Sequence, residues 1–243
     1  MEAIILAGGK AERLGDAAGG LPKPLVEVGG TPLAAWQIAL LAQAGVDRVI
    51  VSCAAGTAQE FERRLGGLGP EIAVAEEPER LGRGGGIRFA AQQRREEGDV
   101  YALNGDELLD VDFRMLLDRH RGSGAAATIT VVQPKSPFGV VDLDGDRVTG
   151  FSEGGTIACW VSCGIYVLGE EALERLPERG DHETSTFPEL AAEGRLGAVR
   201  HDGIWLTVNT PKDLRRAEEY VSAHPEWLSG VGSRGRGTPA DVA

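Results

Sequence analysis

Two basic side chains in a glycine-rich segment near the start of the chain are the first candidates for chemistry. The segment LAGGKAERLGDAAGGLPKPL spans residues 6–25 and contains Arg13 and Lys23. Glycines that follow a buried strand let backbone N–H groups approach an anion that side chains would block. The two cations could hold a small anionic substrate, while a flexible surface loop is the alternative for this segment.

Two further segments place glycines and polar groups where a ligand could bind. Residues 75–90, AEEPERLGRGGGIRFA, contain four glycines within five residues. Each glycine costs roughly 0.5–1 kcal/mol inside regular structure, which favours close approach of a ligand over a glycine-rich helix start without one. Residues 101–110, YALNGDELLD, place Asn104 and Asp106 after a buried strand, where ligands of open α/β sheets bind. An aspartate that caps a turn is the alternative at Asp106.

The elements that would position these residues alternate between strands and helices in the first half of the chain. Thr31 and Pro32 predict the N-cap and first turn of a helix that runs to about residue 44. The alternation predicts a parallel, doubly wound sheet with helices on both faces. The expected strands are 2–7, 47–53, 71–77 and 99–105, and the other expected helices are 57–65 and 85–97.

From about residue 124 the pattern becomes mostly β, with Asp144-Gly145 as the expected hairpin turn. Helices are expected over 169–176 and 186–194, strands over 196–201 and 204–208, and a last helix from Pro211 to about residue 223. Thr210, Pro211 and Asp213 predict the N-cap, the first-turn proline and the capping-box acid of this last helix. We expect one domain over 1–227 and a disordered tail over 228–243, because the last residues are rich in Gly, Ser and Pro and lack apolar periodicity.

The composition limits the classes of partner. Among 243 residues the net charge is −12, so a nucleic-acid partner is not expected. The apolar runs are far shorter than a membrane span, and no secretory signal is visible. Three cysteines, at positions 53, 159 and 163, have no metal-type spacing and suggest the thiols of a reducing compartment, with the cytoplasm as the expected location. The composition does not decide the oligomeric state, and a homo-oligomer is possible.

Several of these segments together resemble one enzyme family over nearly the whole chain. The run LAGG-K-AERLG…LPKPL resembles the L-A-G-G-x-G-T-R-L…P-K-P-L signature of sugar-1-phosphate nucleotidylyltransferases, also called NDP-sugar pyrophosphorylases. The resemblance implies a Rossmann-like, mostly parallel mixed sheet flanked by helices, with a small sugar-binding β lobe. The matching positions are Gly8, Gly9, Arg13, Leu14, Pro22, Lys23, Pro24 and Leu25, whereas Ala11 and Glu12 depart from the signature.

The resemblance also implies a reaction and roles for individual residues. A sugar-1-phosphate oxygen attacks the α-phosphorus of a nucleoside triphosphate, and pyrophosphate leaves. Arg13 would grip the triphosphate, and Lys23 would bridge the α-phosphate and the sugar phosphate. The residues that would bind the nucleotide are Leu6, Ala7, Gly8, Gly9, Glu77, Gly82, Gly85 and Asn104.

Metal and sugar ligands follow from the same resemblance. Asp106 matches the family's N-G-D aspartate, which holds Mg²⁺, and Asn209 of VNTP would be the second metal ligand. Thr207 stands where many members have a second metal aspartate, and Gly154 replaces a phosphate-binding lysine, for which Lys135 or Arg83 could substitute. The residues that would bind the sugar are Gly139, Glu153, Ser162 and Gly164.

The sequence does not determine the base of the nucleotide or the identity of the sugar. The L-G-x-x-G-G-I pattern resembles the corresponding segment of guanylyltransferases for mannose- or heptose-1-phosphate. It also resembles that of uridylyltransferases for N-acetylmuramate-1-phosphate. We rank the guanylyltransferase first. A catalytically silent, nucleotide-sugar-binding regulatory relative is the alternative of another class, because the family residues at 11, 12, 154 and 207 are replaced.

Overall fold

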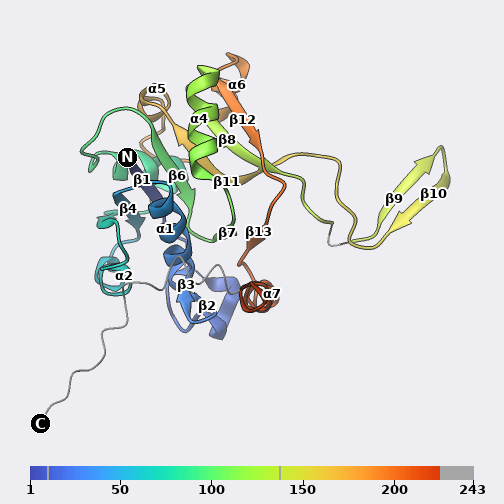
Figure 1. The fold of residues 1–243 in the computed structure, drawn as a ribbon, viewed down its shortest axis with the longest axis horizontal. Coiled ribbons are helices and arrows are strands. Elements are labelled where there is room, and N and C mark those ends of the chain that lie inside the picture. The colour runs from blue at the N-terminus through green and yellow to red at the C-terminus, as the bar shows by residue number, and fades with distance from the viewer. Residues whose placement is uncertain (10, 137, 225–243) are drawn as a thin grey trace, which may run out of the picture.

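The computed structural model describes residues 1–9, 11–136 and 138–224 (Figure 1). The expected tail at 228–243 lies outside the described residues, as do residues 225–227 of the expected domain. Among the described residues, no helix is long and apolar enough to cross a membrane.

A sheet of seven strands forms the centre of the described chain, in the order β12-β8-β11-β6-β1-β4-β5. Neighbouring strands are parallel except around β11, which is antiparallel to both β6 and β8. The sheet is therefore mixed but mostly parallel, as predicted. Its strands are β1 (Glu2–Leu6), β4 (Arg48–Cys53), β5 (Glu71–Glu76), β6 (Val100–Asn104), β8 (Ala127–Val132), β11 (Val161–Leu168) and β12 (Leu196–Arg200).

Helices cover both faces of this sheet. Successive side chains of a strand point to opposite faces, and accordingly Ala3 and Ile5 join one buried cluster while Ile4 joins another. The first cluster contains residues of α1 (Leu33–Gln43), α2 (Ala58–Leu65) and α4 (Phe113–Ser123). The second contains residues of α3 (Gly82–Ala91), α5 (Glu170–Glu174) and α6 (Thr186–Ala192).

A third buried cluster lies at the carboxyl edge of the parallel strands. It joins the 3₁₀ segment η1 (Glu12–Ala18), the start of α1 and the last helix α7 (Pro211–Ala223) around Leu14, Leu206 and Val221. The short strand pairs β2 (Glu27–Val28) with β3 (Thr31–Pro32), and β7 (Glu107–Leu109) with β13 (Trp205–Thr207), belong to the same region. This cluster fixes the first loop of the chain against its last helix.

A two-stranded hairpin, β9 (Val140–Asp144) and β10 (Arg147–Ser152), projects from the body of the molecule (Figure 1). We call residues 138–153 the arm. The hairpin was predicted, but Asp144 pairs with Arg147, so the turn residues are 145–146 instead of 144–145. Gly145 takes the left-handed conformation that this turn requires, with φ of 58°.

Two helix boundaries differ from the prediction. Thr31 is not the N-cap of α1: Thr31 and Pro32 form β3, the N-cap position falls on Pro32, and no side chain caps this helix. Pairing with β2 holds this dipeptide in an extended conformation. The third helix spans Gly82–Ala91 rather than 85–97, because it begins within the glycine run and the charged residues after Ala91 turn back toward β6.

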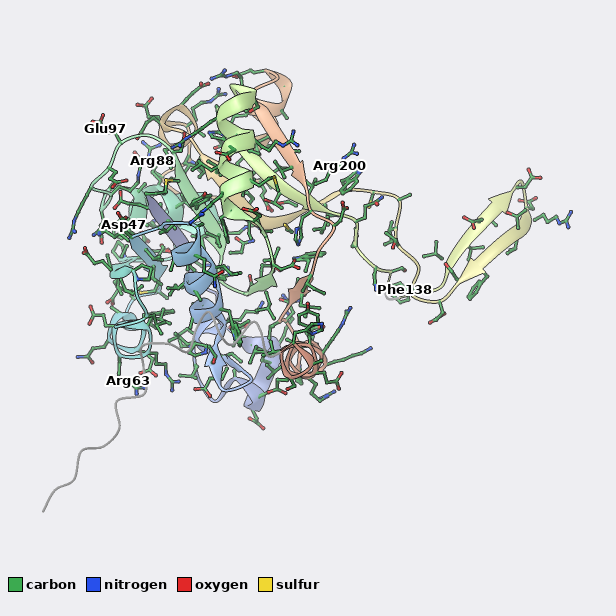
Figure 2. The ribbon with its side chains drawn as sticks, viewed as in Figure 1. Asp47, Arg63, Arg88, Glu97, Phe138 and Arg200 are labelled. Atoms are coloured by element: carbon green, nitrogen blue, oxygen red, sulfur yellow. The ribbon has the colours of Figure 1, made fainter. Side chains whose placement is uncertain are left out.

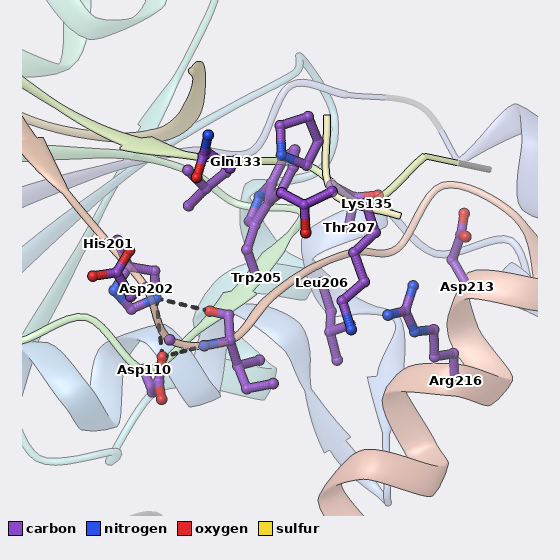
Figure 3. Close-up of a pocket in the computed structure, with 15 residues that line it drawn as sticks. Asp110, Gln133, Lys135, His201, Asp202, Trp205, Leu206, Thr207, Asp213 and Arg216 are labelled. Carbon is purple, nitrogen blue, oxygen red and sulfur yellow. Dashed lines mark hydrogen bonds and ion pairs between the residues drawn. The ribbon is translucent and has the colours of Figure 1, made fainter. Parts of the chain in front are cut away.

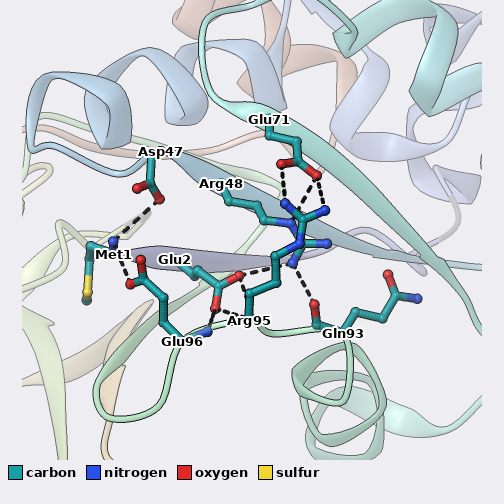
Figure 4. Close-up of polar contacts among 8 residues, drawn as sticks. All are labelled: Met1, Glu2, Asp47, Arg48, Glu71, Gln93, Arg95 and Glu96. Carbon is teal, nitrogen blue, oxygen red and sulfur yellow. Dashed lines mark hydrogen bonds and ion pairs between the residues drawn. The ribbon is translucent and has the colours of Figure 1, made fainter.

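The opposite end of the sheet, near the N-terminus, is closed by an ion-pair network (Figure 4). Glu2 is 2% exposed and accepts hydrogen bonds from the Arg48 guanidinium and from the backbone N–H groups of Arg95 and Glu96. Burial alone would raise the pKa of Glu2, but these donors hold it below its ordinary value. Every oxygen of this carboxylate is satisfied, so the network is structural.

Candidate active site

The predicted nucleotide-binding segments meet where the sheet changes direction. The chain moves from β1 through β4 to β5, and then returns to the other side of β1 as β6. Crevices at such switch points are the ligand-binding positions of open α/β sheets. The Ala7 N–H donates to the Ser52 carbonyl (2.7 Å) and the Gly105 N–H donates to the Leu6 carbonyl (3.0 Å). These bonds hold the start of the glycine-rich loop between the ends of β4 and β6.

Four residues predicted to act on phosphate and metal converge at this edge. The Lys23 ammonium donates to Asp106 Oδ2 and to Asn209 Oδ1, each at 2.5 Å. The Arg13 guanidinium donates to the same Asn209 oxygen at 3.3 Å. Lys23 is only 8% exposed, whereas Arg13 is exposed. Residues from three distant segments thus form one polar cluster, which we call the catalytic cluster.

The local sequence explains how each member is held. Lys23 begins the 3₁₀ turn η2 (Lys23–Leu25), followed by buried Pro24. Asp106 lies in the turn between β6 and β7, and its carbonyl accepts from the Val208 N–H at 3.1 Å. Asn209 directly precedes the predicted capping box of α7, in which Thr210 and Asp213 bond reciprocally. Asp213 Oδ2 also accepts from the Asn209 N–H at 3.2 Å, which orients this residue.

A second carboxyl group next to Asp106 is buried beneath the cluster. Glu107 is 8% exposed, and the Trp205 indole N–H donates to its Oε2 at 2.7 Å. Burial raises the pKa of Glu107 to about 8, and the neighbouring Asp106 charge adds to this shift. The protonated form of Glu107 is therefore favoured near neutral pH.

Asn104, predicted to bind the nucleotide, has a free acceptor. Its side-chain oxygen is buried and has no hydrogen-bond partner among the described residues. Its amide lies against Gly164, where an added Cβ would come within 2.5 Å of Asn104 Nδ2, and Gly164 has a φ of 72°. Gly164 is therefore required for this approach. Since buried polar groups are nearly always paired, the orphaned oxygen marks a position that suits a ligand hydroxyl or N–H donor.

The glycines of the second segment have a structural explanation as well. Cβ atoms added at Gly82 and Gly85 would lie 2.5 Å from the carbonyl oxygens of Gly180 and Glu178. The start of α3 thus packs directly against the segment 177–182, a contact that sequence reasoning missed. The predicted contact of a base with Gly82 and Gly85 stays a prediction, but close packing already accounts for the absence of side chains.

Glu77, also predicted to bind the nucleotide, lies behind the loop. It is 5% exposed, accepts from the Ser52 hydroxyl at 2.8 Å and from the Leu81 N–H at 3.0 Å, and lies 3.5 Å from a Cβ placed on Gly8. Its carboxylate therefore fixes the turn before α3 against the end of β4. By contrast, a Cβ on Gly9 would meet nothing within 4 Å, so Gly9 faces open space.

Arg83 does not supply a free cation in place of the lysine missing at 154. Its guanidinium forms ion pairs with Asp181 and Glu183, both at 2.5 Å. The Tyr166 hydroxyl donates to Glu183 at 2.9 Å. These contacts tie the start of α3 to the segment before α6.

A pocket of about 660 Å³ opens beside the catalytic cluster (Figure 3). Thr207 and Asp213 line it on the side toward Asn209, and Trp205 lines its middle. Figure 3 shows the side chains of Lys135 and Arg216 extending toward one another in this pocket. Neither has a charged partner within ion-pair distance among the described residues. Lys135 was one of the two predicted substitutes for the missing lysine, whereas Arg216 was missed because the motif identified in this region ends before it.

At the far end of this pocket, His201 forms an ion pair with Asp110 at 3.0 Å. Asp110 raises the pKa of His201 above its ordinary value. Asp110 Oδ1 also accepts from the Ile204 N–H at 2.7 Å, so the pair closes the loop between β12 and β13.

The predicted sugar ligands fall into two places. Ser162 and Gly164 lie on β11, next to β6 and Asn104. Gly139 and Glu153 lie at the base of the arm, which projects away from the body near Phe138 (Figure 2). The structure thus does not bring Gly139 and Glu153 to the catalytic cluster, and their role as sugar ligands stays a prediction.

Cys163 of β11 has a structural role in the core. It is fully buried, and its thiol donates to the Thr130 carbonyl at 3.3 Å. Burial raises the pKa of Cys163 to about 12, so the thiolate is not populated near neutral pH.

Comparisons with known proteins agree with the fold and with the predicted family. A family model described as nucleotidyl transferase matches residues 2–224. A mannose-1-phosphate guanyltransferase of Candida albicans is 32% identical over 94% of this chain and 68% of its own length. A mannose-1-phosphate guanylyltransferase catalytic subunit beta of Xenopus tropicalis is 30% identical over the same shares. The crystal structure of HddC from Yersinia pseudotuberculosis is similar in fold, with a TM-score of 0.71 and 24% identity over 90% of this chain and 98% of that one. The chain belongs to the nucleotidyl transferase family.

Proposed function

We propose that the protein is a Mg²⁺-dependent sugar-1-phosphate nucleotidylyltransferase that joins a nucleoside triphosphate and a sugar-1-phosphate into an NDP-sugar and pyrophosphate. The observation that carries this proposal is the convergence of Arg13, Lys23, Asp106 and Asn209 at the switch point of the sheet. Such a set offers two cations for phosphate oxygens and two oxygens for a metal. A protein that only binds a nucleotide sugar would need no metal carboxylate.

The proposed chemistry consists mostly of positioning and charge neutralisation. The sugar phosphate oxygen attacks the α-phosphorus in line, the bond to the β-phosphate breaks, and pyrophosphate carries away the electron pair. The exposed guanidinium of Arg13 would hold the β- and γ-phosphates and neutralise the departing pyrophosphate. Lys23, nearly buried, would hold the α-phosphate and the incoming phosphate together, so that two anions meet at one ammonium.

Asp106 and Asn209 would hold Mg²⁺, which would neutralise charge on the triphosphate. The oxygens of these two residues already converge on a cation, the Lys23 ammonium. Carboxylate and amide oxygens are ligands that Mg²⁺ accepts. Among the described residues, no group of three or more His, Cys, Asp or Glu side chains could hold a metal. Phosphate oxygens and water would therefore have to complete the coordination.

We propose that the sugar-1-phosphate enters through the pocket of Lys135 and Arg216. Two cations that face one another without a carboxylate partner repel, and an anion between them would relieve this repulsion. The pocket adjoins Asn209 through Thr207 and Asp213, and Gln133 and Thr156 add hydrogen-bonding groups for sugar hydroxyls. These cations would take over the role of the lysine that Gly154 replaces.

GTP and mannose- or heptose-1-phosphate are the substrates we propose first. The two relatives named above carry mannose-1-phosphate guanylyltransferase names. UTP with another sugar phosphate is the alternative, because the glycine pattern at 81–87 is shared with uridylyltransferases. We also propose a cytoplasmic location, which the three free cysteines support, since oxidising compartments favour disulfides.

The test is pyrophosphate release over a matrix of nucleoside triphosphates and sugar-1-phosphates in the presence of Mg²⁺. We expect turnover with GTP and mannose- or heptose-1-phosphate, and no turnover without Mg²⁺. Highest activity with UTP would reassign the base. Binding of nucleotide sugar without turnover of any pair would indicate a catalytically silent relative and refute the proposal.

The pocket has its own test. Lys135→Ala and Arg216→Ala should each raise KM for the sugar phosphate by about tenfold while KM for the nucleotide stays unchanged, the scale of one charge-assisted hydrogen bond. Lys212→Ala, an exposed lysine on the same helix outside the pocket, is the matched control. Equal KM values in all three variants would contradict this placement of the sugar phosphate.

A further inference from the structure

The arm has few contacts with the rest of the chain. Its strands β9 and β10 pair only with each other among the described residues. At its base, the Ser136 N–H donates to the Gly155 carbonyl at 2.9 Å, and Lys135 forms an isolated bridge with Thr156. Figures 1 and 2 show the hairpin standing away from the body. An isolated two-stranded hairpin is at best marginally stable in water, so this element needs a covering layer.

One face of the hairpin carries four apolar side chains. Val148 pairs with Leu143, and Phe151 pairs with Val141, so these four side chains share a face. They are 42% (Val141), 64% (Leu143), 56% (Val148) and 69% (Phe151) exposed. The other face carries Asp142, Asp144, Arg147 and Ser152. This alternation is typical of a strand pair with one side buried against another layer.

The size of this face can be compared with the size of an interface. Four large apolar side chains exposed to this degree present on the order of 400 Å² of apolar surface. A standard interface buries about 800 Å² on each partner. These four side chains therefore supply about half of one partner's share of such an interface.

We propose that the apolar face of the arm packs against the same face of a second copy of this chain, forming a two-fold symmetric dimer. A two-fold interface uses the same patch twice, so the patch must complement itself. A uniformly apolar face does so, because two such faces attract each other without charge pairing. Asp142 and Asp144 lie on the opposite face, so these like charges of the two arms point away from the contact. An anionic partner such as nucleic acid would meet these acids and be repelled.

The test measures the mass of the full chain in solution by sedimentation equilibrium at micromolar concentration without substrates, and therefore does not depend on the activity. We expect the wild type at twice the 25.6 kDa of one chain. Leu143→Glu should convert the protein to a monomer, because the new charge would be buried at the dimer axis. Arg147→Glu, on the opposite face of the arm, is the matched control and should remain a dimer.

Hydrogen exchange of the arm separates the remaining outcomes. Amides of residues 140–152 should become protected as protein concentration rises, and should lose this protection in Leu143→Glu. A monomeric wild type with a protected arm would show that the arm folds onto its own chain, and would overturn the proposal. A monomer with an unprotected arm, or a Leu143→Glu variant that remains a dimer, would overturn it too. Circular dichroism of Leu143→Glu should match the wild type, because this residue is exposed in a single chain.

Discussion

Replacement of Lys23 by methionine is expected to tighten Mg²⁺ binding to the nucleotide-free protein while it weakens catalysis. The Lys23 ammonium lies 2.5 Å from both Asp106 Oδ2 and Asn209 Oδ1, which are the oxygens proposed to hold the metal. A metal ion that uses these oxygens must therefore displace the ammonium. Methionine has nearly the same length and shape but no charge, so Lys23→Met removes the competitor with little change in packing.

The expected size of this effect follows from the contacts that Mg²⁺ would break. A hydrogen bond to a charged group contributes about 1.5–3 kcal/mol. The Asp106 side chain is 30% exposed, so solvent screening places the Lys23–Asp106 contact at the lower end, about 1.5–2 kcal/mol. At 1.4 kcal/mol for each factor of ten, the Kd for Mg²⁺ should fall about ten- to thirtyfold. The value of kcat should fall by roughly 10²–10³, the loss expected for one preorganised charge contact.

Calorimetric titration of Mg²⁺ without nucleotide is the assay. Lys212→Met, an exposed lysine of α7, is the control and should bind Mg²⁺ like the wild type. Lys23→Met combined with Asp106→Asn should lose the gain, because the carboxylate that attracts the metal is gone. Unchanged or weaker Mg²⁺ binding in Lys23→Met would refute the idea that lysine and metal compete for one pair of oxygens.

The remaining predictions concern the cluster and the packing around it. Asp106→Asn should lower turnover at saturating Mg²⁺ by at least about 10² while the melting temperature stays within a few degrees, and near-normal turnover would contradict the metal assignment. Arg13→Ala should lower kcat by roughly 10²–10³, and a change confined to KM would limit Arg13 to ground-state binding. Gly85→Ala should destabilise by about 2 kcal/mol or more, since its Cβ would meet the Glu178 carbonyl, whereas Gly122→Ala in α4, with nothing within 4 Å, should be neutral or stabilising; equal melting temperatures would contradict the packing argument. Burial lowers the pKa of His182 to about 4, whereas its pKa in the unfolded chain is about 6.5. The free energy of unfolding should therefore be unaffected by His182 above pH 6.5 and should fall by up to about 3 kcal/mol as the pH decreases toward 4. When the free energy of unfolding is measured by urea titration at several pH values, His182→Phe should not show this decrease. The same pH dependence in the variant and the wild type would exclude His182 as its source.

The central sheet could be predicted from the sequence because its signal is local. The parallel strands β1, β4 and β6 are short runs buried on both faces, and β1, β4, β5 and β6 all lie within one residue of their expected bounds. The capping box of α7 is local too, since Thr210, Pro211 and Asp213 are contiguous, and it was predicted correctly.

Features that depend on contacts between distant segments could not be predicted in the same way. The glycines at 82 and 85 have no side chains because the segment 177–182 packs against them, and nothing near residue 85 encodes that neighbour. Thr31 and Pro32 carry the local signal of a helix cap, but pairing with β2 overrides it. The pocket cations Lys135 and Arg216 are 81 positions apart in the sequence, so only the fold reveals that they face the same space.

The charges around Asp106 suggest why this site would take its metal together with the nucleotide. Many members of the family resembled have an aspartate at the position of Thr207, whereas here Asn209 would contribute a neutral oxygen and burial favours the protonated form of Glu107. Asp106 is thus the single carboxylate of the two proposed metal ligands, and the Lys23 ammonium already pairs with it at 2.5 Å. Free Mg²⁺ would approach a neutral pair and would have to displace an ammonium from it. A triphosphate brings several negative charges, which would draw Lys23 toward the phosphates and leave Asp106 and Asn209 to the metal. The replacement of one carboxylate by an amide therefore favours a site that forms only when the nucleotide is bound.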